Sequence, residues 1–259
     1  MTEDEILRKL YELQEKEDVM VLHAVESGSR AWGFASPDSD YDVRFIYIRK
    51  TSDYLRLEKT RDVIEWELND VYDINGWDAQ KMLRLLYKSN PTVFEWFHSP
   101  IVYMSEKSAV EKILPEIDSF FSCKAGIYHY LSTAKVNHRA YFKGEKVKLK
   151  KYFYVIRPLL ACRWIIEKGT PPPMLFSELL NTVAEMEIVP VIEELVRIKV
   201  ETPEKAYGNR IPELDRYIEK NREYVKKYLD GMPDDRNYSW KKLNDIFMYL
   251  VNYRQGNLK

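Results

Sequence analysis

Cysteine is scarce in this sequence. Only Cys123 and Cys162 occur among 259 residues, and neither belongs to a Cys-x-x-Cys motif or stands near clustered histidines. A disulfide framework needs several cysteines, and a zinc finger needs closely spaced Cys or His ligands. The sequence therefore excludes both classes, favours a reducing compartment, and leads us to expect a cytoplasmic protein.

Long hydrophobic runs are also lacking. No apolar stretch approaches the roughly 20 residues that cross a bilayer. The first five residues, Met1 to Glu5, are acidic, whereas the start of a secretory signal is basic. We expect a soluble protein with no membrane partner.

Neither sign of charge dominates. The chain has 40 Lys plus Arg and 41 Asp plus Glu, which gives a net charge of −1. Net charge therefore indicates no class of partner. A hydrophobic content of 45% and a charged content of 31% are ordinary for a globular protein, and the length suggests two modest domains.

The first hundred residues alternate between helical and strand patterns. Residues 6–13 have a helical apolar face, and strand patterns follow at 19–25, 41–48, 62–69 and 71–74. We expect Gly76 to end the last of these strands. A helix is predicted from Asp78 to Lys88, stopped by Asn90-Pro91.

Beyond about Glu106 the strand patterns disappear. Helical patterns occupy 117–141, 149–167, 190–199, 211–229 and 240–253. The predicted fold class is α+β, with a small mixed sheet in an N-terminal domain, residues 1–108, and an all-helical C-terminal domain, residues 109–259.

An Asp-x-Asp pair opens one predicted strand. Asp40 and Asp42 are two residues apart, so on a strand their side chains point to the same face. Adjacent carboxylates repel unless a cation lies between them, and Mg²⁺ prefers carboxylate, water and phosphate oxygens. The pair predicts a clamp for Mg²⁺ or Mn²⁺. The alternative is a solvated turn whose acids cap backbone amides.

A Gly-Ser turn precedes this pair and favours the metal site. Gly28 and Ser29 follow a predicted strand, eleven to thirteen residues upstream of the acids. Glycine lets the backbone approach a phosphate, and exposed N–H groups with a Ser hydroxyl bind its oxygens. We expect Gly28 and Ser29 to bind a nucleotide, assisted by Arg30 unless Arg30 forms a salt bridge with a nearby acid.

The order of strand, Gly-Ser, connecting segment and Asp-x-Asp strand resembles the DNA polymerase β-like nucleotidyltransferase superfamily. The resemblance implies a nucleotidyltransferase domain in which two metal ions are held by three carboxylates. It implies that Asp40 and Asp42 bind both ions, and that a third acid comes from a neighbouring strand. Candidates for that acid are Asp62, Glu65, Glu67, Asp70 and Asp73. We select Asp73, because an acid between apolar residues needs a partner such as a metal.

Longer motifs resemble one branch of that superfamily. The segment from Asp73 through Gly76-Trp77-Asp78 to Glu95-Trp96, together with Lys150 to Tyr154 and Arg157-Pro158, is similar to the YcgL or RlaP family of predicted nucleotidyltransferases, some of them encoded beside RNA ligases. The resemblance covers most of the first 180 residues. Residues beyond about 180 add little to it.

A basic stretch follows in the helical half. It contains Lys135, Arg139, Lys143, Lys146, Lys148, Lys150, Lys151, Arg157 and Arg163, with Glu145 as the acid among them. Lys151, Tyr154 and Arg157 are spaced to share one helix face and are predicted to bind the phosphates and base of a nucleotide. The stretch fits an RNA backbone or a triphosphate, but a basic helix face is equally compatible with simple solvation.

The expected activity is metal-dependent transfer of a nucleoside monophosphate from an NTP to an acceptor hydroxyl, such as an RNA end. One alternative is a nucleotidyltransferase that modifies a protein or a small molecule. Another is an inactive, antitoxin-like binding protein. The sequence specifies neither acceptor nor base, and it leaves a homo-oligomer open. The four histidines have no metal-ligand spacing, and His23 is expected to be packed in a strand.

Overall fold

The computed structural model describes residues 3–36, 38–69, 71–201, 207–237 and 239–256. Contacts gather the chain into two compact units. The first unit comprises residues 1–28, 40–120 and 237–259, and the second comprises residues 29–39 and 121–236. Contacts do not test which segments fold independently, so the predicted domain boundary near residue 108 stays a prediction.

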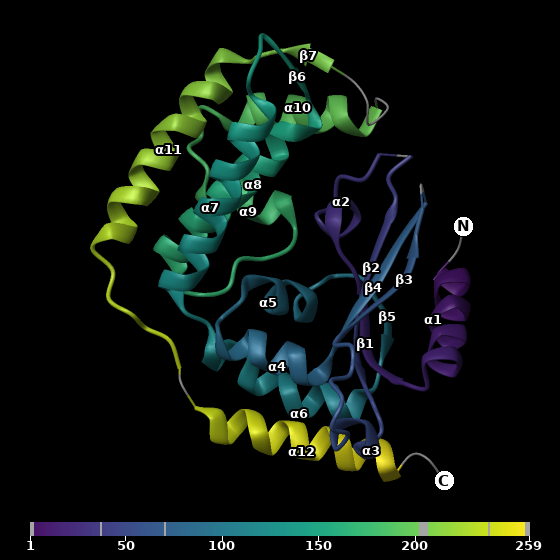
Figure 1. The fold of residues 1–259 in the computed structure, drawn as a ribbon. Coiled ribbons are helices and arrows are strands. Elements are labelled where there is room, and N and C mark those ends of the chain that lie inside the picture. Colours follow the sequence, from purple (N-terminus) through teal and green to yellow (C-terminus); the bar gives the residue numbers. More distant parts are fainter. Residues whose placement is uncertain (1–2, 37, 70, 202–206, 238, 257–259) are drawn as a thin grey trace. The chain divides into compact units, whose positions relative to one another are not determined.

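The first unit is built on a five-stranded sheet with the order β3-β4-β2-β1-β5 (Figure 1). The strands are β1 (Met20–Glu26), β2 (Tyr41–Ile48), β3 (Val63–Leu68), β4 (Tyr72–Asp78) and β5 (Val102–Ser105). β2 and β4 are parallel, and the other neighbouring pairs are antiparallel. This mixed sheet confirms the predicted fold class, and β2 has the bounds expected from its apolar alternation.

Helices cover both faces of this sheet (Figure 1). On one face, Ile6, Leu10 and Leu13 of α1 (Glu3–Glu17) are spaced by four and three residues and pack against β1, β2 and β4. On the other side, α4 (Ala79–Tyr87) and α12 (Trp240–Gly256) contact β2, and α6 (Lys107–Ile117) contacts β1. The short helices α3 (Thr51–Tyr54) and α5 (Pro91–Phe97) complete this unit, and the short helix α2 (Gly28–Ala31) begins in it at Gly28 and continues into the second unit.

The second unit is mainly helical. Its helices are α7 (Cys123–Tyr141), α8 (Lys150–Lys168), α9 (Phe176–Val183), α10 (Val189–Glu201) and α11 (Pro212–Asp230), and the 3-10 turn Asp118–Phe120 precedes them. Its core contains Phe153, Ile156 and Leu160 of α8 together with Phe34, which comes from the loop between β1 and β2 and contacts the ring of Phe153. The expectation that no strand follows residue 106 is wrong in one detail, because β6 (Lys146–Lys148) pairs with β7 (Tyr207–Asn209).

Gly76 does not end a strand, contrary to the prediction. β4 continues through Gly76 to Asp78, and a Cβ at Gly76 would lie 2.3 Å from the ring of Phe45 on β2. Glycine is needed there because an aromatic ring of the neighbouring strand occupies the side-chain position. Asp78 then caps α4 by accepting a hydrogen bond from the Gln80 amide at 2.7 Å.

Candidate active site

Four polar side chains form a square on one face of β2 and β4. The parallel register pairs Asp42 with Asp73 and Arg44 with Asn75. Residues paired across a sheet point to the same side, so the two carboxylates lie next to each other on neighbouring strands. The intervening residues Val43 and Ile74 face the apolar core under α1. Strand alternation thus separates this polar group from the core.

Arg44 links the two carboxylates. Its Nη2 donates to Oδ1 of Asp42 at 3.0 Å and to Oδ2 of Asp73 at 2.7 Å. Its Nη1 donates to the backbone carbonyls of Asp73, at 2.6 Å, and Val43, at 3.1 Å. The Arg44 side chain is 15% exposed, so these contacts are largely shielded from water. Asn75 adds a hydrogen bond from Nδ2 to Oδ1 of Asp73 at 3.0 Å.

Gly28 lies against the carboxylate of Asp42. Its φ is +58°, in the left-handed region, and a Cβ there would lie 1.9 Å from Oδ2 of Asp42. Backbone conformation and space therefore both require glycine. The Ser27 amide donates to the Asp42 carbonyl at 2.8 Å, which holds the end of β1 beside the start of β2.

A buried acid, which the sequence analysis missed, orients Asp42 through its backbone. Glu26 is fully buried, and its Oε1 accepts a hydrogen bond from the Asp42 amide at 2.8 Å. Its Oε2 accepts another from the hydroxyl of Tyr103 on β5. An acid at the end of an otherwise apolar strand was the signal in the sequence, because a carboxylate is buried only where donors surround it.

Asp40 differs from the other two predicted acids. It is exposed and precedes the first residue of β2, whereas Asp42 and Asp73 are half-buried on their strands. Within the described parts of the chain, no three Asp, Glu, His or Cys side chains are grouped so as to hold a metal ion. The assignment of Asp40, Asp42 and Asp73 as metal ligands stays a prediction.

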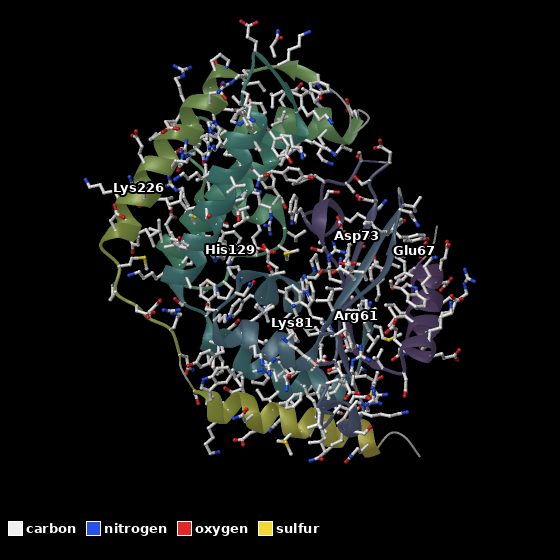
Figure 2. All side chains as sticks on the ribbon, in the orientation of Figure 1. Arg61, Glu67, Asp73, Lys81, His129 and Lys226 are labelled. Carbon is white, nitrogen blue, oxygen red and sulfur yellow. The ribbon has the colours of Figure 1, made fainter. Side chains whose placement is uncertain are left out.

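The other candidates for the third acid have different partners. Asp62 pairs with Lys81 at 3.2 Å, and Glu67 pairs with Lys9 of α1 at 2.7 Å, on the sheet face opposite Asp73. Figure 2 labels Glu67 and Asp73 on their neighbouring strands. Glu65 is exposed, and Asp70 lies outside the described residues. Among the candidates that can be compared, Asp73 is the one paired in register with Asp42.

Ser29 and Arg30 belong to the second unit, although Ser29 directly follows Gly28 in the chain. Oγ of Ser29 donates to Oγ of Ser39 at 3.2 Å, and Nη2 of Arg30 donates to the Ser39 carbonyl at 2.6 Å. These two residues therefore brace the ends of the connecting loop against each other. Whether they also bind phosphates stays a prediction.

Lys151, Tyr154 and Arg157 form part of an aromatic and cationic row in the second unit. Nζ of Lys151 lies 4.3 Å from the ring centroid of Tyr154 and 4.0 Å from that of Tyr141. The Arg157 guanidinium lies 4.7 Å from the ring centroid of Trp32, which contacts Tyr154 edge-on. Trp32 is a member of this row that the sequence analysis did not select.

The basic stretch separates into two groups in the second unit. Arg157 is buried, and Arg163 forms ion pairs with Glu167 and Glu185 at 3.2 Å and 2.9 Å. These two arginines therefore do not extend the exposed basic surface, and the role of Arg157 in nucleotide binding stays a prediction. The other group contains the exposed side chains Lys135, Arg139, Lys143 and Lys146 and the half-buried Lys148, Lys150 and Lys151.

His23 is packed, as expected. It is buried on β1 and stacks on the ring of Phe97 with a centroid distance of 5.3 Å. Burial lowers the pKa of His23 to about 4, because the protein interior disfavours the charged imidazolium. Cys123 and Cys162 are both free thiols.

Residues 2–249 match the model of RlaP, the RNA repair pathway DNA polymerase beta family. The chain belongs to the RlaP family. This result confirms the resemblance carried by the Gly28-Ser29 turn and the Asp-x-Asp pair, and it supports a protein of the nucleotidyltransferase class.

Two individual proteins are similar to this RlaP member. The uncharacterized protein YcgL of Bacillus subtilis (strain 168) is 41% identical over 247 residues, which are 95% of each chain. A nucleotidyltransferase-like protein from Exiguobacterium sibiricum 255-15, known from a crystal structure, is 13% identical with a TM-score of 0.32 over 96% of this chain and 80% of that one. Within the described residues, no helix has both the length and the apolarity for a membrane crossing.

Proposed function

We propose that this RlaP protein transfers a nucleoside monophosphate from an NTP to a hydroxyl at an RNA end, with Mg²⁺ or Mn²⁺ as cofactor. The observation that carries the proposal is the register of Asp42 and Asp73 on parallel strands, with Gly28 pressed against Asp42. The RNA acceptor is supported by the family's connection with RNA repair and by the exposed basic side chains of the second unit.

The residues of the square fit a divalent cation in chemistry and in charge. Asp42 and Asp73 supply the carboxylate oxygens that Mg²⁺ and Mn²⁺ prefer. A cationic guanidinium already lies between them, so this place favours positive charge. Because Gly28 has no Cβ, no side chain at position 28 covers Oδ2 of Asp42.

In the proposed reaction, the oxygen of the acceptor hydroxyl bonds to the α-phosphorus of the NTP. The bond from the α-phosphorus to the oxygen that bridges the α- and β-phosphates breaks, and pyrophosphate leaves. The hydroxyl proton passes to water. Bound Mg²⁺ or Mn²⁺ would lower the pKa of the acceptor hydroxyl and neutralise charge on the leaving pyrophosphate. Asp42 and Asp73, with Asp40, would hold the ions.

The other candidate residues of the site position the acids or bind the nucleotide in this proposal. Glu26 fixes the backbone of Asp42, and Gly28 with Ser29 lets the chain approach the triphosphate. Arg30 assists these two residues. Lys151, Tyr154 and Arg157 contribute cationic and aromatic groups for the nucleotide.

The proposal is tested by incubating the protein with each α-labelled NTP and Mg²⁺, with and without RNA that carries a free terminal hydroxyl. Asp42→Asn should lower the rate of RNA labelling at least roughly 100-fold, the scale on which loss of a transition-state-stabilising group acts. Asp62→Asn is the matched control, because Asp62 is an acid of the same unit paired with Lys81 away from the square. It should label RNA at the wild-type rate.

The same assay separates the alternatives. Labelling of the protein itself or of a small molecule would show that the acceptor is that protein or small molecule and not RNA, with the same transfer chemistry. No label with any NTP, together with tight binding of a partner protein, would favour the inactive binding protein. Equal labelling by Asp42→Asn and wild type would contradict the proposed active site.

A further inference from the structure

The guanidinium of Arg44 lies between the carboxylates of Asp42 and Asp73. Its Nη2 contacts one oxygen of each carboxylate, Oδ1 of Asp42 and Oδ2 of Asp73, at 3.0 Å and 2.7 Å. A cation coordinated by both oxygens and Nη2 of Arg44 cannot share that space, and their positive charges repel at short distance.

The remaining contacts of Arg44 anchor it independently of the carboxylates. Nη1 donates to the backbone carbonyls of Val43 and Asp73 at 3.1 Å and 2.6 Å. These two bonds do not involve the carboxylates. A pivot of the guanidinium about Nη1 would therefore release Asp42 and Asp73 while Arg44 stays beside the site.

We propose that Arg44 is a resident cation of the metal-free protein that competes with the divalent metal for Asp42 and Asp73. The inference rests on the proposed function, because it concerns the metal of that site. Arg44 neutralises the two adjacent carboxylates while no metal is bound, which stabilises the unit against their repulsion. Arg44 is a positioning residue, and it sets the metal affinity.

Competition has a thermodynamic consequence of definite sign. Metal binding to the wild type breaks two charge-assisted hydrogen bonds from Nη2, and it leaves a guanidinium next to the ion. Removing the guanidinium removes both costs, so the metal should bind more tightly while the metal-free protein becomes less stable.

The test compares Mn²⁺ binding to wild type and Arg44→Gln, measured from the electron paramagnetic resonance signal of free Mn²⁺. Arg44→Gln should bind Mn²⁺ at least tenfold more tightly. Its melting temperature should fall by several degrees in chelator and rise more than that of wild type on addition of millimolar Mn²⁺. Arg44→Lys keeps a charge but has no planar fork to reach both acids, and it should bind Mn²⁺ with intermediate affinity.

Lys9→Gln is the matched control. Lys9 forms an ion pair with Glu67 at 2.7 Å, and the two side chains are 16% and 27% exposed. The side chains of the Arg44–Asp73 pair have nearly the same exposure, 15% and 27%. It lies on the opposite face of the same sheet. Its loss should change the melting temperature without changing Mn²⁺ affinity, which separates a general loss of stability from competition.

Two results would overturn the inference in distinguishable ways. In the first result, Asp42→Asn abolishes Mn²⁺ binding, but Arg44→Gln weakens it or leaves it unchanged. This result would contradict competition by Arg44 and would agree with the proposed function. Absence of any Asp42-dependent Mn²⁺ binding in wild type and Arg44→Gln alike would contradict both the competition and the proposed metal site.

Discussion

At the residue scale, the candidate site depends on Asp42 and Asp73, which are paired in register on β2 and β4, and on buried Glu26, which accepts a hydrogen bond from the Asp42 amide. Asp42 and Asp73 could be selected because each stands in a strand pattern, where an acid needs a partner. Their register could not be predicted, since pairing between strands separated by thirty residues depends on the whole sheet. Arg44 and Glu26 were missed because a charged residue in a strand does not reveal which neighbouring strand it meets.

His23 gives a prediction at this scale for the pH dependence of stability. Its pKa is lowered to about 4 in the folded protein, whereas the imidazole of an unfolded chain has a pKa near 6.5. Between these values the unfolded state binds more protons, so stability present above pH 6.5 is lost as the pH falls towards 4. The loss due to His23 should be roughly 3 kcal/mol in the free energy of unfolding.

Urea denaturation at a series of pH values between 7 and 4 measures this loss. His23→Phe keeps the ring next to Phe97 but cannot be protonated, so its stability should fall less steeply over the same range. Parallel pH profiles for the two proteins would show that His23 is not the titrating group.

At the element scale, apolar alternation predicted whole strands but not their continuation through glycine. β2 begins and ends at the predicted residues, while β4 continues past Gly76 because the ring of Phe45 fills the side-chain position there. Short elements were missed. α5 begins at Pro91, after the Asn90 cap that was interpreted only as a stop, and β5 has four residues, too few for a periodic signal.

Gly76→Ala tests the contact that lets β4 continue. A methyl group 2.3 Å from the Phe45 ring forces the ring or the strand to shift, which should lower the free energy of unfolding by about 1–3 kcal/mol. Gly144→Ala is the control, since no heavy atom lies within 4 Å of a Cβ at that position. Equal urea midpoints for the two variants would contradict the steric explanation.

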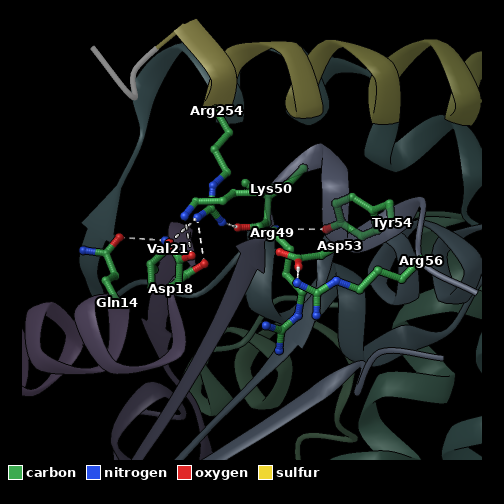
Figure 3. Close-up of polar contacts among 10 residues, drawn as sticks. Gln14, Asp18, Val21, Arg49, Lys50, Asp53, Tyr54, Arg56 and Arg254 are labelled. Atoms are coloured by element: carbon green, nitrogen blue, oxygen red, sulfur yellow. Dashed lines mark hydrogen bonds and ion pairs between the residues drawn. The ribbon is translucent and has the colours of Figure 1, made fainter. Parts of the chain in front are cut away.

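At the scale of the whole molecule, the compact units combine segments that are far apart in the chain. The final helix, α12, belongs to the first unit, and the loop of residues 29–39 belongs to the second. Local patterns predict helices and strands but do not tell which distant helix covers a sheet. Figure 3 shows buried Arg254 of α12 next to Asp18, where it donates to the backbone carbonyl and the carboxylate of Asp18. Arg254 also donates to the Ile48 carbonyl at the end of β2.

Arg254→Met should therefore weaken the packing of α12 against the rest of the first unit and destabilise that unit. Loss of hydrogen bonds from a buried cation should cost about 2–3 kcal/mol in the free energy of unfolding. Hydrogen exchange should become faster in β1 and β2 and stay unchanged in α7 and α8, because these helices belong to the second unit. Lys241→Met, at an exposed position of the same helix, should change neither the free energy of unfolding nor the exchange rates. If Arg254→Met accelerated exchange equally in the two units, the division of the chain into these units would be contradicted.

We propose above that Asp42 and Asp73 form the metal-binding centre of a nucleotidyltransferase. The most direct measurement is anomalous diffraction from crystals of the wild-type protein that contain Mn²⁺ and a non-hydrolysable NTP. We expect a Mn²⁺ peak within coordination distance of both carboxylates, with Nη2 of Arg44 displaced from them and the triphosphate beside Gly28. A nucleotide bound elsewhere, with Arg44 still bridging Asp42 and Asp73, would contradict the proposed metal centre.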